Sequence, residues 1–187
     1  MATYGPDQFI SSKGKSLIIR NLTQDDASVF IEFRKQIAHE TTNTYQYVGQ
    51  ETLPEDQIAR KLAAAVSDSI HLNLGVFDEK KLIGQLNFRP VIPGHPWVKH
   101  VGEFGMMILK ENWGQGIGRR LLMIQEQHAL ECGVTRIEAA VRVKNERGTR
   151  LYQSAGFEIE GTRKAAALIQ GEFQDEYYIA KRLGNMD

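Results

Sequence analysis

The chain has 187 residues, of which 42% are hydrophobic and 25% charged, and its 23 basic residues balance its 23 acidic residues. This composition is typical of a globular protein with room for one substantial core, and it excludes a disordered chain. The balanced charge argues against a general attraction to nucleic acid or to an anionic membrane surface.

Cysteine content and hydropathy indicate the compartment. The single cysteine, Cys132, cannot form a disulfide within the chain. No uninterrupted apolar stretch reaches the roughly 18 residues that a membrane helix needs, and the first residues do not resemble a secretory signal. We therefore expect a protein of the reducing cytoplasm. Residues 1–15 lack periodicity and predict a flexible arm, ahead of a single domain over residues 16–184.

The first elements in chain order are a strand and two helices. An apolar run at residues 17–19 predicts a short strand. Thr23 can cap a helix, in which apolar residues recur at helical spacing up to residue 37. Residues 41–52 are polar and predict a loop, after which Pro54 suits the first position of a second helix.

Strands dominate the middle of the chain. Residues 71–77 and 81–91 flank a three-residue connection, which predicts an antiparallel hairpin. A loop containing two prolines occupies residues 92–97, and a third long strand is expected over residues 98–109.

The last third alternates helices and strands. Three glycines, at 114, 116 and 118, precede an amphipathic helix that Gly133 can end. The remaining pattern predicts a strand at 136–143, a helix at 146–155 and strands at 157–168 and 173–183. A strand, a glycine-rich turn, a helix and a strand in succession are typical of an α/β protein.

The glycine-rich segment Asn112–Arg120 carries the strongest chemical signal. Glycines let a backbone approach a ligand closely, and the free N–H groups of a helix's first turn favour a phosphate. Arg119 and Arg120 would add positive charge there. The dinucleotide pattern is excluded because Leu121 replaces its third glycine, and no Gly-Lys-Ser/Thr sequence indicates a nucleotide-triphosphate loop. The alternative is that these glycines only build a tight connection.

At these residues the chain resembles the GCN5-related N-acetyltransferase (GNAT) superfamily, over residues 17–183. The acyl-CoA loop pattern Gln/Arg-x-x-Gly-x-Gly/Ala falls on Trp113–Gly118, with Trp113 in place of Gln or Arg, as in members similar to ribosomal-protein N-terminal acetyltransferases. Residues 145–157 look like the family segment Asn-x-x-Ala-x-x-Leu-Tyr-x-x-x-Gly-Phe, with Gly148 in place of the alanine. The segments 160–163 and 171–177 look like the ending of small-amine and N-terminal members.

The resemblance implies an α/β (α+β) GNAT fold, in which a mixed, mostly antiparallel twisted sheet with a splayed central strand pair is flanked by helices. It also implies acetyl-CoA as co-substrate. Pantetheine amides can pair with strand backbone that is exposed at the splay. Asn145 would hold the cofactor, or cap a helix. The expected cofactor-binding residues are Met107, Ile108, Leu109, Gly114, Gln115, Gly116, Ile117, Gly118, Arg119 and Asn145.

The resemblance also supplies catalytic candidates. Glu103 lies in a segment, Glu-Phe-Gly-Met, similar to the one where the family commonly places a catalytic carboxylate, and we expect it to accept the amine's proton directly or through water. Its alternative is a solvent-facing or substrate-orienting role. Tyr152 is the expected general acid for the leaving thiolate, and its alternative is an aromatic residue packed on Phe157. The backbone N–H of Ile108 is the expected oxyanion donor.

Other reactive residue types give weaker signals. Cys132 shares a helix stripe with His128, and both are expected in the core. The remaining histidines do not group with cysteine or acidic residues, so no metal is expected. A basic run, formed by Arg142, Lys144, Arg147 and Arg150, is expected to be a solvated face, of which one or two residues meet the cofactor's ribose phosphate.

The sequence therefore predicts an N-acetyltransferase that moves an acetyl group to the primary amine of a small metabolite in a ternary complex. The alternatives are an N-terminal peptide acetyltransferase, transfer to a hydroxyl, and a non-catalytic acyl-CoA sensor. No dense acidic cluster appears in the acceptor-side loops, residues 38–52 and 92–99, which argues against polyamines and basic protein tails. Neither nucleic acid nor a membrane is an expected partner, whereas a homodimer is left open.

Overall fold

A computed structural model describes residues 4–184 of the chain. Within this range the strands form an eight-stranded sheet in the order β1-β2-β3-β4-β5-β6-β8-β7. The strands are β1 (Asp7–Ile10), β2 (Ser16–Asn21), β3 (Leu72–Asp78), β4 (Lys81–Pro90), β5 (Val101–Ile108), β6 (Arg136–Arg142), β7 (Glu158–Ile169) and β8 (Glu172–Arg182). The α-helices are α1 (Ala27–Glu40), α2 (Glu55–Ser67), α3 (Ile117–Glu131) and α4 (Glu146–Ser154), with short 3-10 turns η1 (Gln24–Asp26) and η2 (Lys110–Asn112).

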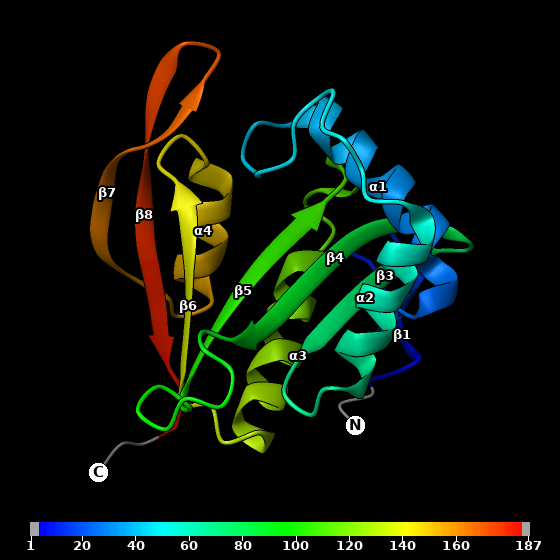
Figure 1. Cartoon of the computed structure of the whole chain (residues 1–187), viewed down its shortest axis with the longest axis horizontal. Coiled ribbons are helices and arrows are strands. Elements are labelled where there is room, and N and C mark those ends of the chain that lie inside the picture. The colour runs from blue at the N-terminus through cyan, green and yellow to red at the C-terminus, as the bar shows by residue number, and fades with distance from the viewer. Residues whose placement is uncertain (1–3, 185–187) are drawn as a thin grey trace.

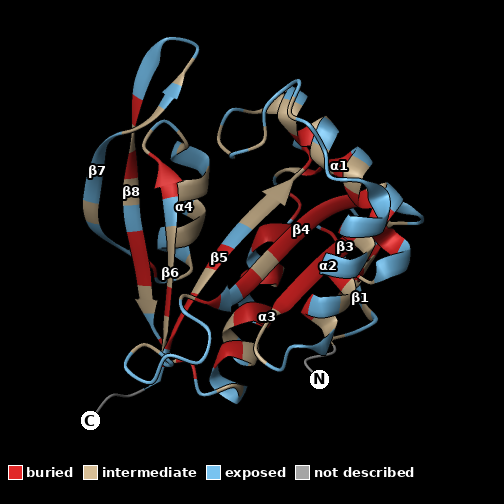
Figure 2. Cartoon of the chain, viewed as in Figure 1, coloured by how far each residue is buried: buried red, intermediate tan, exposed pale blue. Residues whose placement is uncertain are grey.

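The helices cover both faces of this sheet. Figure 1 shows α1 and α2 on the face toward the viewer and α3 and α4 behind. The central strands β3 and β4 are therefore buried along most of their length, as Figure 2 shows. The largest fully buried side chains include Phe33 of α1, Leu74 and Phe88 of the sheet, and Ile117 of α3. No helix within residues 4–184 is long and apolar enough to cross a membrane.

The sheet is mixed, and its only parallel neighbours among the described strands are β5 and β6. These two strands pair only from Val101↔Arg136 to Glu103↔Glu138. Beyond this point β5 stays paired with β4 as far as Ile108, while β6 pairs with β8 on its other side. Figure 1 shows the resulting divergence of β5 and β6. The predicted fold class and its splayed central pair are confirmed.

The register of β5 decides which backbone groups face the gap. Leu109 N–H donates to Ile83 O of the β4 side at 3.0 Å. Hydrogen-bonding direction alternates along an antiparallel strand, so Met107 also points its N–H toward β4. Met106 and Ile108 then direct their N–H groups into the gap.

The N-terminal segment differs from the expectation of a loose arm. Residues Asp7–Ile10 form β1, an edge strand paired antiparallel with β2. Asp7 forms an ion pair with Arg120 of α3 at 2.6 Å, and Phe9 packs against the core. These partners lie far away in the sequence, and four residues are too few for a clear alternating pattern, so local sequence did not predict the strand.

Two other boundaries shift. The strand expected from residue 98 begins at Val101, because residues 95–101 turn twice through the bonds Val98 N–H to His95 O and Val101 N–H to Val98 O. The helix expected after Thr23 starts with a 3-10 turn, in which Asp26 accepts hydrogen bonds from the Thr23 backbone and hydroxyl before α1 begins.

Two glycines of β5 offer a matched test of packing beside the gap. A Cβ at Gly102 would lie 2.3 Å from Phe88 Cε2, whereas a Cβ at Gly105 would have no heavy atom within 4 Å. We expect Gly102→Ala to lower the free energy of unfolding by about 1–3 kcal/mol through overpacking. Gly105→Ala should leave the free energy of unfolding unchanged or raise it by less than about 1 kcal/mol, since the added methyl group only restricts the unfolded chain. Urea unfolding measures both, and equal effects would contradict the packing at Gly102.

Candidate active site

Two adjoining cavities lie where β5 and β6 diverge. The loop cavity, of about 630 Å³, is bounded by the glycine-rich loop, the end of β5 and the start of α4. The sheet cavity, of about 930 Å³, lies over β4, β5, β6 and β8, and residues of α1, α2 and the loop after α1 also line it. Both cavities are lined by Asn43, Thr44, Met106, Met107, Asn145 and Tyr152.

The glycine-rich loop presents N–H groups to the loop cavity. Gly114 and Gly116 adopt the left-handed φ values of 73° and 82°, which favour glycine. The carbonyl groups of Gly114 and Gln115 are held by Ser12, through its hydroxyl and its N–H, each at 3.2 Å. The N–H groups of residues 116–119, in the first turn of α3, have no hydrogen-bond partner among the described residues. This arrangement suits a phosphate.

Gly118 has a different reason to be glycine. A Cβ at this position would lie 2.7 Å from Leu151 Cδ2, so the missing side chain lets α3 pack closely on α4. Gly116 therefore shapes the loop through its positive φ, whereas Gly118 permits close packing of α3 on α4.

Cations gather unevenly around the loop cavity. Arg119 lines it, whereas Arg120 is occupied by its ion pair with Asp7. Arg147 of α4 places its guanidinium over the ring of Trp113, with Cζ 5.0 Å from the centroid. Trp113 is itself fixed by its Nε1–H, which donates to Ile108 O at 2.7 Å. A cation from α4 thus lies beside the position where the family pattern has Gln or Arg, and no local pattern in the sequence indicates this pairing.

The predicted residues of β5 separate into two groups. Met107 and Ile108 line the loop cavity. Leu109 does not fit its expected role, because its side chain is fully buried in the core and its N–H is bonded to Ile83. β5 ends at Ile108, and the chain then enters the core, so we no longer expect Leu109 to bind the cofactor. Met106, which the sequence analysis did not select, lines both cavities.

Asn145 caps α4 and also faces both cavities. Its Oδ1 accepts a hydrogen bond from Gly148 N–H at 3.0 Å, while its Nδ2 has no partner among residues 4–184. A Cβ at Gly148 would lie 2.6 Å from that Nδ2, which explains glycine where the family segment has alanine. The cap thus leaves a free amide donor at the junction of the cavities.

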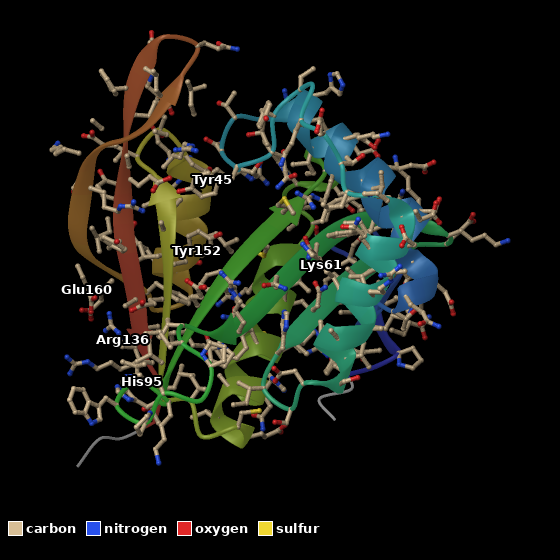
Figure 3. All side chains as sticks on the ribbon, in the orientation of Figure 1. Tyr45, Lys61, His95, Arg136, Tyr152 and Glu160 are labelled. Carbon is tan, nitrogen blue, oxygen red and sulfur yellow. The ribbon has the colours of Figure 1, made fainter. Side chains whose placement is uncertain are left out.

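Tyr152 occupies the gap between β5 and β6 (Figure 3). Its ring packs against Phe104 and Phe157, at centroid distances of 5.5 and 5.9 Å. Burial raises the pKa of Tyr152 to about 12. The hydroxyl has no hydrogen-bond partner in the described part of the chain, and the residue lines both cavities. Tyr152 therefore packs on Phe157, as the alternative interpretation expected, and its hydroxyl also lies where it could contact a ligand.

Glu103 lines the sheet cavity near the point where strand pairing ends. Its Oε1 accepts a hydrogen bond from Arg89 Nε at 2.8 Å and lies 2.7 Å from Arg89 Nη2 in an ion pair, and its side chain is 40% exposed. Oε2 makes no hydrogen bond to any described residue. Glu103 and Tyr152 both line the sheet cavity, so the structure brings the two predicted catalytic side chains to one site.

An ionic cluster around the buried Glu176 lies at the end of β6 that has parted from β5. Glu176 of β8 is 2% exposed and accepts hydrogen bonds from Tyr45 Oη at 3.0 Å, Arg142 Nη1 at 3.0 Å and Arg163 Nη1 at 3.2 Å. Arg142 also donates to Thr42 O at 3.0 Å. The cluster ties the loop after α1 to β6 and β8. Arg142 was expected on a solvated face and is instead 4% exposed.

Metal-ligating residues do not gather in this site. Within residues 4–184 no group of three or more His, Cys, Asp or Glu side chains could hold a metal ion.

Comparisons with known proteins agree with this geometry. The model of the Acetyltransferase (GNAT) family matches residues 34–157. The L-amino acid N-acetyltransferase AaaT of Escherichia coli is 37% identical over 87 residues, which cover 46% of this chain and 54% of that protein. A GNAT-family acetyltransferase structure from Streptococcus pneumoniae has a TM-score of 0.83 at 27% identity, covering 90% of this chain and 99% of that one.

A further structure shows the same fold with its ligand. The putative acetyltransferase yncA of Salmonella typhimurium, solved with its cofactor acetyl-CoA, has a TM-score of 0.77 at 18% identity, covering 90% of this chain and 94% of that one. Because the family model covers most of the chain, including the glycine-rich loop and Tyr152, the protein belongs to the Acetyltransferase (GNAT) family, a family of acetyl-CoA-dependent acetyltransferases.

Proposed function

We propose that this protein transfers the acetyl group of acetyl-CoA to the primary amine of a small metabolite, by direct attack in a ternary complex. Family membership supplies the reaction class, and the acceptor and the roles of individual residues are the proposal. The observation that carries it is the junction of the two cavities at Tyr152 and Met106, where a donor in one cavity and an acceptor in the other would meet.

The loop cavity fits the donor. Free N–H groups at residues 116–119 would hold the pyrophosphate, with Arg119 and Arg147 adding positive charge. The gap-facing N–H groups of Met106 and Ile108 would bind the pantetheine arm and the thioester oxygen, assisted by Asn145 Nδ2.

The chemistry needs two proton transfers. Glu103 would accept a proton from the amine through water, so that the nitrogen can attack the thioester carbon. As the carbon–sulfur bond breaks, Tyr152 would direct its hydroxyl toward the leaving sulfur. With a pKa of about 12 for Tyr152 and about 8.5 for a thiol, full transfer is uphill by about 5 kcal/mol. The hydroxyl therefore acts best as a hydrogen-bond donor to the developing thiolate, with a final proton from water.

The charges of the sheet cavity favour a compact acceptor without several cationic groups. Its acidic residues all have basic partners: Glu103 pairs with Arg89, Glu138 with Arg136, and Glu176 with Arg142 and Arg163. A polyamine would need unpaired carboxylates, since each desolvated ammonium is costly. The E. coli relative, named an L-amino acid N-acetyltransferase, supports a small amine.

Coenzyme A release against parallel acceptors tests this function. We expect an amino acid or related small amine to be acetylated on nitrogen, with product confirmed by mass, at a kcat/KM above that of N-terminal peptides, polyamines and aminoglycosides. Peptides that exceed every small amine by about tenfold would identify a protein N-terminus as the acceptor. Binding of acetyl-CoA without thiol release would identify a sensor, and a hydroxylamine-labile product would identify transfer to a hydroxyl.

The glycine-rich loop can be tested with an isosteric pair. Gly116→Asp and Gly116→Asn share the cost of a side chain at positive φ, and the nearest heavy atom to a Cβ there is Phe9 Cζ at 3.5 Å, so both fit. Only aspartate puts a negative charge beside the proposed phosphate site. Acetyl-CoA affinity, measured by calorimetry, should fall about tenfold or more further in Gly116→Asp than in Gly116→Asn, and the difference should shrink in high salt. Equal affinities would place the phosphate elsewhere.

The role of Tyr152 predicts a pH profile. Because burial raises the pKa of its phenol from 10 to about 12, the hydroxyl stays protonated throughout the range where acetyl transfer is measured. We expect no loss of kcat through phenol ionisation near pH 10, and a fall of about 100-fold in Tyr152→Phe. Stability and acetyl-CoA affinity should change little, since the hydroxyl lacks a hydrogen-bond partner within residues 4–184. A wild-type rate decrease near pH 10 that disappears in Tyr152→Phe would contradict the assigned environment.

A further inference from the structure

The sheet cavity has an excess of positive charge. Its basic lining residues are Arg34, Lys61, Arg89, Arg142 and Arg163. Three of these have an acidic partner: Arg89 pairs with Glu103, whereas Arg142 and Arg163 share the single carboxylate of Glu176. Arg34 and Lys61 have no acidic partner among residues 4–184. They come from neighbouring helices, Arg34 from α1 and Lys61 from α2, on the face that looks onto the sheet cavity.

Arg34 is held in place without being neutralised. It is half-buried, its Nε donates to Gln46 Oε1 at 2.8 Å, and its guanidinium lies over the ring of Phe30, with Cζ 5.7 Å from the centroid. Its two Nη groups make no hydrogen bond to any described residue. Burial lowers the pKa of Arg34, and no carboxylate offsets this effect. A fixed, partly desolvated cation is costly unless something negative binds to it.

Lys61 supplies a second, weaker charge at the same cavity. Its side chain is exposed, and Figure 3 shows it on the side of α2, across β5 from Tyr152. An exposed ammonium is screened by water and adds less than a half-buried guanidinium. The two free Nη groups of Arg34 also match the two oxygens of a carboxylate, which an ammonium cannot do.

We infer that the acceptor carries a carboxylate in addition to its reacting amine, and that Arg34, assisted by Lys61, binds this carboxylate in the sheet cavity. The inference rests on the proposed function, and it assigns Arg34 as a specificity-determining residue. Anchoring at Arg34 would leave the amine free to extend toward Glu103 and the junction at Tyr152. The other three arginines are each engaged in an ion pair with Glu103 or Glu176, so the lining cations without an acidic partner among the described residues are Arg34 and Lys61.

The test compares an amino acid, chosen as the best acceptor of the panel, with its own carboxamide. The amide has nearly the same shape and carries its primary amine at the same position, but it has no negative charge. In the wild type the acid should be preferred in kcat/KM. In Arg34→Gln the value for the acid should fall about 10- to 100-fold while that for the amide changes less than about threefold. The quantity to compare is the acid-to-amide ratio of kcat/KM. The two amines differ in basicity, but this difference affects the variant and the wild type equally, so it cancels when their ratios are compared.

Matched variants separate charge from structure. Lys35→Gln removes an exposed cation from the next position of α1, outside the cavity lining, and should leave the ratio unchanged. Lys61→Gln should lower the acid-to-amide ratio of kcat/KM by less than Arg34→Gln does. Arg34→Lys, which keeps the positive charge, should retain more of the wild-type ratio than Arg34→Gln.

Three results would overturn the inference. An acid-to-amide ratio in Arg34→Gln equal to that of the wild type, with neither value reduced, would show that Arg34 does not bind the carboxylate. An equal loss for both acceptors in Arg34→Gln, together with a lower Tm, would show that Arg34 only anchors Gln46. If no amine supports coenzyme A release from the wild type, both the proposed function and this inference fail. If amides are acetylated and Arg34→Gln does not change the preference for acids, only this inference fails and the proposed function stands.

Discussion

The parting of β5 and β6 after three paired residues is the constraint on which the rest of the structure depends. Each strand is held on its far side, β5 by β4 and β6 by β8, so neither can turn back to close the gap. The backbone groups of Met106 and Ile108 are then left without a strand partner, and buried N–H groups need one. A ligand with amide groups would satisfy them, which is why we propose that the gap between β5 and β6 binds the extended arm of the cofactor.

The edges of the gap are kept in place by contacts between distant segments. At the loop cavity, Ser12 holds two carbonyl groups of the glycine-rich loop, so that glycines with little conformational preference of their own present N–H groups in one direction. At the sheet cavity, Glu176 gathers two arginines and Tyr45 from three parts of the chain. Removing the Glu176 carboxylate would leave the buried Arg142 guanidinium without an acidic partner among the described residues, so the cluster holds the loop after α1 against β6 and β8.

The two cavities differ in which of their charged side chains have a partner of opposite charge. The loop cavity combines free N–H groups with Arg119 and Arg147, which suits a polyanion. In the sheet cavity every acidic residue has a basic partner, and Arg34 and Lys61 are the lining cations without an acidic partner among the described residues. Tyr152 stands between them in an apolar setting, where its phenol keeps its proton. Burial and ion pairing, and not residue type alone, thus decide which side chains of the two cavities present a charge and which stay neutral.

The sequence by itself determined the fold class, the order of most strands and helices, the glycine-rich loop and the second block around Asn145 and Tyr152. These features follow from local periodicity, turn chemistry and motif spacing, which a linear chain displays directly. Tertiary structure alone decided that residues 7–10 form a strand, that Leu109 belongs to the core, and that Arg147 stacks on Trp113. It also separated the arginines into the paired Arg142 and the unpaired Arg34. The reason is physical: burial and ion pairing depend on partners up to about a hundred residues away, and no pattern within a short window records which of them will meet.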